Sequence, residues 1–147
     1  MAPTRTPPTS EEELIILDEG FEGSAYTDSL GYLTIGVGRL IDKRKGGCIT
    51  MAEASYLLTN DLLKVRAALT ATFPWFSSLD HVRQGVMVSL RFQLGQVGLL
   101  EFTRFLGDMG AGNWASAASE LQESRLAQQA PDRIARHAKA LVTGEWQ

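Results

Sequence analysis

A chain of 147 residues is long enough for one domain, or for two small lobes that share a core. With 44% hydrophobic and 21% charged residues, its composition is that of a globular protein and excludes disorder over most of the length. The formal net charge of −3 argues against long-range attraction to nucleic acid, and the single cysteine excludes an internal disulfide.

The first predicted elements are an arm and a short helix. Residues 1–9 are rich in proline and predict a flexible arm, without the apolar core of a secretory signal. Ser10 and Glu13 have the spacing of a capping box, which predicts a helix over 10–19 that ends at Gly20. The chain nowhere contains the run of about 18 apolar residues that a membrane span requires, so we expect no stable membrane insertion.

A β-hairpin is predicted next. In the segment YLTIGVG (32–38), three aliphatic residues alternate with Tyr, Thr and Gly. This period of two predicts a buried aliphatic face, with Thr34 on the opposite face. Before it, Asp28 opens and Gly31 closes a four-residue segment that is typical of a type I turn.

The rest of the chain is predicted to be helical. Thr50 and Glu53 form a second capping box, which opens a helix running to about Ala71. Apolar residues recurring every fourth position predict a buried helix: Val82, Val86, Leu90 and Leu94. The last two helices are expected over Trp114–Leu126 and Pro131–Val142, where proline suits a first helical position. A small sheet followed by helices is an α+β arrangement.

Carboxylates crowd the region between the first helix and the hairpin. Glu19, in the last turn of a helix, would face the negative end of the helix dipole, which raises a carboxyl pKa as a general acid requires. It could equally be an exposed surface acid, and Asp18 and Glu22 are equally acidic neighbours. Asp28 fits a turn residue, or a second carboxylate about 6.5–9.5 Å from the first, as in inverting glycosidases. Thr34 fits a strand, or a hydroxyl that holds a water beside Asp28.

The spacing of Glu19, Asp28 and Thr34 resembles the catalytic spacing of the phage-type lysozymes, glycoside hydrolase family 24. The resemblance runs from about Glu12 to Trp146. It includes further similar segments: Ile49-Thr50 with Glu53-Ala54, Ser78-Leu79-Asp80 with Val82-Arg83, Phe92-Gln93-Leu94-Gly95, Asn113-Trp114, Ser124-Arg125, Ala130-Pro131-Asp132-Arg133 and Thr143-Gly144-Glu145-Trp146.

The resemblance implies a lysozyme-like fold of two lobes. Residues 10–147 would form one catalytic domain, with a small N-terminal β lobe over about 20–55. A long helix over about 51–71 would join it to a mostly helical C-terminal lobe over about 72–147. The helix 10–19 would pack on that second lobe.

The same resemblance implies the roles of the site residues. Glu19 would be the general acid that cleaves the β-1,4 bond from N-acetylmuramic acid to N-acetylglucosamine. Asp28 and Thr34 would place the attacking water, and Arg133 would pair with Glu19. Cleft positions that contact sugar rings would be Leu40, Phe92 and Gln93. Arg39 stands where many family members carry histidine after the GxG of the hairpin, and Phe105 and Glu120 stand at cleft positions where the T-even phage lysozyme has small hydroxyl or amide groups.

We therefore expect a muramidase of the endolysin type, a monomer that acts on bacterial peptidoglycan without a metal or cofactor. It would accumulate in the host cytoplasm and reach the cell wall after a holin-type protein opens the membrane. A catalytically inactive wall-binding module and a lytic transglycosylase remain as alternatives. A virion-borne lysozyme used at entry and a prophage-derived copy remain as variants of the same activity.

Overall fold

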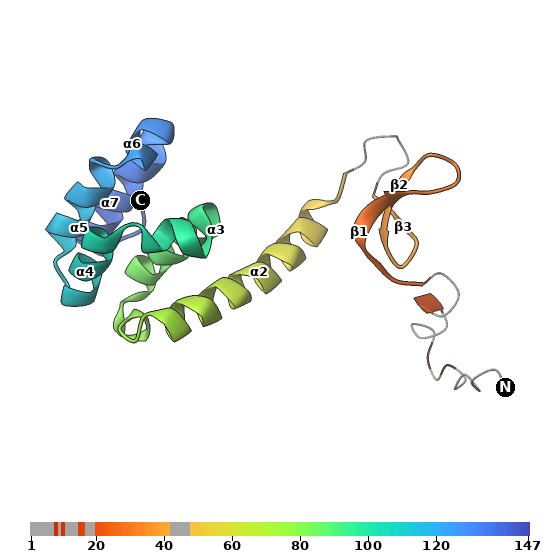
Figure 1. Ribbon diagram of the computed structural model, residues 1–147, viewed down its shortest axis with the longest axis horizontal. Coiled ribbons are helices and arrows are strands. Elements are labelled where there is room, and N and C mark those ends of the chain that lie inside the picture. The colour runs from red at the N-terminus through yellow and green to blue at the C-terminus, as the bar shows by residue number, and fades with distance from the viewer. Residues whose placement is uncertain (1–7, 9, 11–14, 17–19, 42–47) are drawn as a thin grey trace. The chain divides into compact units, whose positions relative to one another are not determined.

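The structure is a computed structural model that describes residues 8, 10, 15–16, 20–41 and 48–147 (Figure 1). Most of the predicted arm and most of the predicted helix 10–19, including Glu19, lie outside the described residues. The chain divides into two compact units, Met1–Tyr56 and Leu57–Gln147. In the described part of the chain, no helix combines the length and apolar character needed to cross a membrane.

The described part of the first unit is built around a three-stranded antiparallel sheet with the order β1-β2-β3. Its strands are β1 (Glu22–Thr27), β2 (Leu33–Gly36) and β3 (Arg39–Leu40). The backbone N–H of Gly31 donates to the carbonyl of Asp28 over 3.0 Å, which closes the turn between β1 and β2. The predicted hairpin is therefore confirmed, and a short third strand extends it.

The predicted burial of the hairpin faces is wrong. Thr34 is 3% exposed and is the buried residue of the sheet, whereas the aliphatic residues of 32–38 are only half-buried. Because β2 is the central strand, Thr34 lies opposite Tyr26 of β1 on one side and Leu40 of β3 on the other. Side chains directly opposite each other share a face, so these two larger neighbours cover the threonine.

Helix α2 (Met51–Thr72) begins at the predicted capping box. The backbone N–H of Glu53 donates to Thr50 Oγ1 over 3.3 Å, and the backbone N–H of Thr50 donates to Glu53 Oε2 over 2.8 Å. Hydrogen bonds from Thr50 and the charge of Arg39 hold the pKa of Glu53 below its usual value, against a smaller opposing effect of burial. The helix ends one residue beyond the predicted Ala71.

The second unit is helical after α2 and a 3₁₀ turn, η1 (Phe76–Ser78), and Figure 1 shows its helices gathered together. They are α3 (His81–Leu100), α4 (Thr103–Ala111), α5 (Trp114–Gln122), α6 (Arg125–Gln129) and α7 (Pro131–Thr143). Their core includes side chains that are at most 1% exposed: Val82, Met87, Leu90, Leu99, Phe105, Met109, Leu121, Ile134 and Leu141. The α+β, lysozyme-like architecture is thus confirmed.

Two predicted helices of this unit have different outcomes. The predicted helix 114–126 is divided, because Ser124 adopts an extended backbone and its hydroxyl donates to the carbonyl of Leu121 over 2.6 Å. A serine hydroxyl that bonds nearby backbone competes with helix continuation. The last helix begins at Pro131 as predicted and ends at Thr143, one residue beyond the predicted Val142. Gly144 follows as the cap, and its φ of 72° is left-handed and suits glycine.

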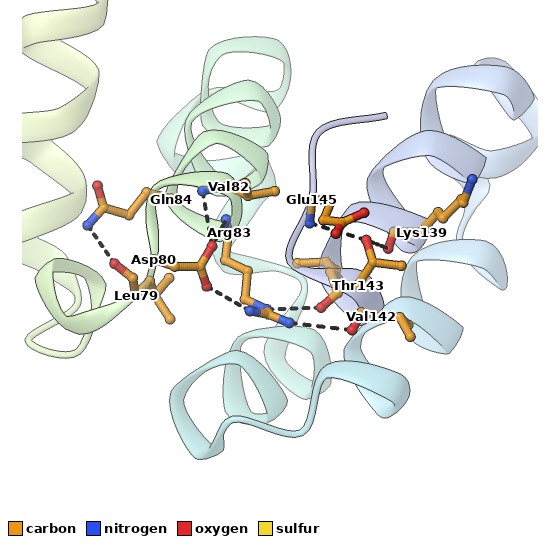
Figure 2. A network of polar contacts seen from close by, with 10 residues as sticks. Leu79, Asp80, Val82, Arg83, Gln84, Lys139, Val142, Thr143 and Glu145 are labelled. Atoms are coloured by element: carbon orange, nitrogen blue, oxygen red, sulfur yellow. Dashed lines mark hydrogen bonds and ion pairs between the residues drawn. The ribbon is translucent and has the colours of Figure 1, made fainter.

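Helix α3 is anchored at its start to the end of α7 (Figure 2). Asp80 caps α3 by accepting hydrogen bonds from the backbone of Val82 and Arg83, each over 3.0 Å. Arg83 donates to Asp80 Oδ2 over 2.7 Å and to the carbonyl of Leu141 over 2.9 Å. Its guanidinium lies 4.3 Å from the ring centroid of Trp114, so one arginine ties α3, α5 and α7 together.

Candidate active site

Asp28 and Thr34, two of the predicted catalytic residues, converge on the backbone of Tyr32. Asp28 Oδ1 accepts a hydrogen bond from the Tyr32 N–H over 2.8 Å. The Thr34 hydroxyl donates to the Tyr32 carbonyl over 3.3 Å, and the Asp28 N–H donates to the same carbonyl over 2.9 Å. The structure therefore brings the Asp28 carboxylate to the backbone N–H of Tyr32, and the Thr34 hydroxyl to the backbone carbonyl of the same residue.

Only one of the two carboxylate oxygens of Asp28 accepts hydrogen bonds from the turn. Its Oδ1 accepts from Leu30 N over 2.9 Å as well as from Tyr32 N, which fixes the carboxylate against the turn. Within the described part of the chain, Oδ2 accepts no hydrogen bond. Asp28 thus acts as the turn residue that the sequence predicts, while its second oxygen is left for another partner.

The surroundings of Thr34 combine polar and apolar groups. Tyr26 is 37% exposed and Leu40 is 42% exposed, and they flank the threonine on neighbouring strands. Half-exposed apolar surface beside a few oriented polar groups is typical of a ligand site. Leu40 was predicted to contact sugar, whereas Tyr26 was not predicted. The strand register places Tyr26 beside Thr34.

The acidic candidates beside the hairpin are described only in part. Glu19 and Asp18 lie outside the described residues. Glu22 is the first residue of β1 and is exposed, and its Oε1 accepts a hydrogen bond from Ser24 Oγ over 3.1 Å. Glu22 therefore lies on the solvated surface of the sheet, at the far end of β1 from the Asp28 turn.

The other predicted site residues belong to the second unit. Phe92 and Gln93 are consecutive exposed residues of α3, and Phe92 is 53% exposed although its neighbour Leu90 is buried. They precede Gly95, whose φ of 71° introduces a kink into the helix. Arg133 is an exposed residue of the first turn of α7.

A groove of about 730 Å³ lies on the same unit, between α4, α5 and α6. Phe105, one of the departures from the T-even pattern, is 1% exposed and packs edge-on against Phe102 with ring centroids 6.4 Å apart. Glu120, another departure, is half-buried and lies 3.7 Å from Arg104 Nη1. The groove thus has an aromatic floor and a rim that carries both charges.

Metal ligation has no support in this part of the chain. Among the described residues, no three His, Cys, Asp or Glu side chains are grouped so that they could hold a metal ion. The exposed Cys48 lies just before α2.

A small antiparallel sheet precedes a helical unit, with Asp28 in the turn between β1 and β2 and Thr34 on the central strand, which is the arrangement expected of a lysozyme-like protein. A family model described as phage lysozyme matches residues 17–139, so the chain belongs to the phage lysozyme family of peptidoglycan hydrolases. The matched residues include all three positions of the predicted catalytic pattern, Glu19, Asp28 and Thr34.

Curated relatives are distant but extend over nearly the whole chain. The chain is 26% identical to "Probable T4-type lysozyme 1" of Dictyostelium discoideum, covering 92% of this chain and 95% of that protein. It is 29% identical to the "Pre-baseplate central spike protein Gp5" of Enterobacteria phage T4, covering 94% of this chain. The chain spans only 28% of the length of that spike protein.

Proposed function

We propose that this chain is a muramidase that hydrolyses the β-1,4 bond between N-acetylmuramic acid and N-acetylglucosamine in bacterial peptidoglycan. The observation that carries the proposal is the convergence of Asp28 and Thr34 on Tyr32, in a chain that belongs to a family of peptidoglycan hydrolases. Glu19 is included in the proposal because its spacing from these two residues resembles the catalytic spacing of that family. The turn itself requires neither the buried hydroxyl of Thr34 nor the second carboxylate oxygen of Asp28, which accepts no hydrogen bond from the described backbone.

In the proposed reaction, Glu19 protonates the leaving glycosidic oxygen as general acid. Asp28 Oδ2 accepts a proton from the attacking water. The Thr34 hydroxyl, which donates to the Tyr32 carbonyl, accepts a hydrogen bond from the same water through its free lone pair. Attack from the face opposite the leaving group inverts the anomeric carbon and yields a reducing muramic acid end.

The remaining site residues would bind the substrate or support the acid. Leu40 would offer an apolar surface to a sugar ring, and Phe92 and Gln93 would offer ring and amide contacts. Arg133 would pair with Glu19 and hold it in position, which favours its charged form and opposes the effect of a helix end. No metal or cofactor takes part in the proposed reaction.

As a biological role we propose host lysis by a monomeric endolysin. The protein would be made in the host cytoplasm and would reach peptidoglycan through a membrane opened by a holin-type protein. The likeness to a phage spike protein supports a second candidate, in which the same activity serves a virion at entry. Detecting the chain in purified particles would favour the second role over the first.

The test is cleavage of purified peptidoglycan, with the products identified by mass. We expect reducing muramic acid ends from the intact protein, and a loss of at least about 10²-fold in rate for Glu19→Gln, Asp28→Asn and Thr34→Val. Thr70→Val is the matched control because Thr70 is an exposed residue of α2, and it should retain full activity. Anhydro ends would make the protein a lytic transglycosylase. Binding without cleavage would make it an inactive wall-binding module.

A further inference from the structure

One wall of the Thr34 site is a very short strand. Strand β3 consists of Arg39 and Leu40, and its ladder to β2 is extended by one hydrogen bond, from Ile41 N to Leu33 O over 2.9 Å. Strands of globular proteins usually have about five or six residues, so a two-residue edge strand is weakly held by its ladder alone. A contact beyond the β2–β3 ladder is therefore needed to hold Leu40 beside Thr34.

Arg39 supplies a contact from β3 to the first turn of α2. Its guanidinium forms an ion pair with Glu53 Oε1. The other oxygen of that carboxylate, Oε2, accepts hydrogen bonds from Thr50 N over 2.8 Å and from Thr50 Oγ1 over 2.9 Å. One glutamate thus caps the helix with one oxygen and holds the strand with the other.

The two roles of Glu53 distinguish its ion pair with Arg39 from an ordinary surface ion pair. An exposed pair usually contributes little, because two long side chains must be ordered for one attraction that water screens. Here the capping box already orders Glu53, so only the 63% exposed Arg39 loses side-chain freedom. The pair of Lys64 and Asp61 on α2 lacks such a feature, with 80% and 54% exposed side chains 3.8 Å apart.

We propose that Arg39 is a positioning residue, which holds β3 on Glu53 and thereby keeps Leu40 against the catalytic Thr34. Arg39 acts through Leu40 and does not contact substrate. The inference rests on the proposed function, because it concerns the geometry of the hydroxyl that would hold the attacking water. A displaced Leu40 would leave Thr34 free to reorient, and such misplacement lowers the catalytic rate more than substrate affinity.

The test compares Arg39→Gln, Glu53→Gln and the double variant in the full chain. Glutamine at position 53 keeps an oxygen for the capping box and replaces the oxygen that faces Arg39 with an amide group, which removes the ion pair. Lys64→Gln and Asp61→Asn are the matched controls, since they break an exposed ion pair with the same changes in charge. We expect each of the first two to lower kcat about three- to fivefold, while KM, to which Leu40 contributes as a proposed sugar contact, rises by a smaller factor.

Two further readouts separate positioning from a general loss of stability. The double variant should be no slower than the slower single variant, and Arg39→Lys should recover part of the lost kcat. Amide hydrogen exchange at Ile41 should accelerate about three- to fivefold in Arg39→Gln and Glu53→Gln, and should not change in the controls.

Wild-type kcat and unchanged Ile41 exchange in Arg39→Gln would overturn the inference. So would equal losses in the Lys64 and Asp61 controls, or fully additive losses in the double variant. If the intact protein cleaves no peptidoglycan, the proposed function fails by itself. The exchange of Ile41 then still decides whether Arg39 and Glu53 hold the strand.

Discussion

Asp80 provides a sharp test of the energetics of the helical unit, because each of its two oxygens makes a separate contact. Its Oδ1 caps α3 through two backbone N–H groups, and its Oδ2 lies 2.7 Å from Arg83 Nη1. Replacement by alanine removes both contacts. The lost cap costs about 1 kcal/mol, and the lost partner of a largely buried arginine adds about 0.5–1 kcal/mol. We therefore expect Asp80→Ala to lower the free energy of unfolding by about 2 kcal/mol.

Asparagine at position 80 separates the two contributions. Its side-chain oxygen is as good a cap as that of aspartate, so only the contact of Oδ2 with Arg83 is lost. We expect Asp80→Asn to cost about 0.5–1 kcal/mol. Arg83 keeps its hydrogen bond to Leu141 and its contact with Trp114 in both variants.

The stability difference between wild type and Asp80→Asn should depend on pH. Burial alone would raise the pKa of Asp80, but hydrogen bonds from Arg83 and Val82 and the charge of Arg83 outweigh it and hold the pKa below its usual value. A carboxyl with a lowered folded-state pKa contributes stability above its unfolded pKa, and this contribution is lost as the pH falls through the folded value. The difference should therefore be constant from about pH 7 to 5 and shrink below about pH 4.

Urea unfolding monitored by tryptophan fluorescence is the appropriate assay, because all three tryptophans lie after residue 57 and report on the second unit. The reasoning would be refuted if Asp80→Ala and Asp80→Asn were equally stable, since the cap would then contribute nothing. A difference between wild type and Asp80→Asn that grew on acidification would refute the role assigned to the charge.

Two further predictions concern the packing and titration of the helical unit. A Cβ at Gly85 would lie 2.2 Å from Trp146 Cη2, so Gly85→Ala should cost about 1–3 kcal/mol in urea unfolding. Gly107 is helical, and a Cβ added there would meet no atom within 4 Å. Gly107→Ala should therefore raise the free energy of unfolding by about 0.4–1 kcal/mol. An equal loss of stability in both variants would contradict this prediction. Burial, followed by the charges of two neighbouring arginines, lowers the pKa of His137. The unfolded chain then binds the proton more readily than the folded one, so the free energy of unfolding should fall as the pH drops below about 6.5. This fall should be smaller in His137→Gln. Identical pH profiles of stability in the two proteins would show that His137 does not cause it.

Several elements were predictable because their signals are local. The capping box of Thr50 and Glu53 determines the start of α2 within four residues of sequence, and its hydrogen bonds are as predicted. Pro131 marks the start of α7 because its missing N–H is no loss at a first helical position. Apolar residues at every fourth position from Val82 to Leu90 identify the buried side of α3, whereas Leu94, predicted with them, is only half-buried. Each of these features depends on neighbours within one or two turns.

Other features depend on contacts that sequence spacing does not report. A period of two indicates that Thr34 and Ile35 point to opposite faces, but which face is covered depends on the pairing of Tyr26 and Leu40. Strand β3 has too few residues for a periodic pattern. The ion pair of Arg39 and Glu53 joins residues from different elements, so neither residue alone indicates it.

The two interpretations of Asp28 that the sequence left open are compatible with each other. The turn uses Oδ1, which accepts from Leu30 N and Tyr32 N, and the proposed reaction uses Oδ2. Because an asparagine oxygen can replace Oδ1, the turn itself does not require a carboxylate. Asp28→Asn should therefore keep the hairpin and lose the reaction, whereas Asp28→Ala should weaken both. Full activity with asparagine at position 28 would make Asp28 a turn residue alone, and the attacking water would then need a different base.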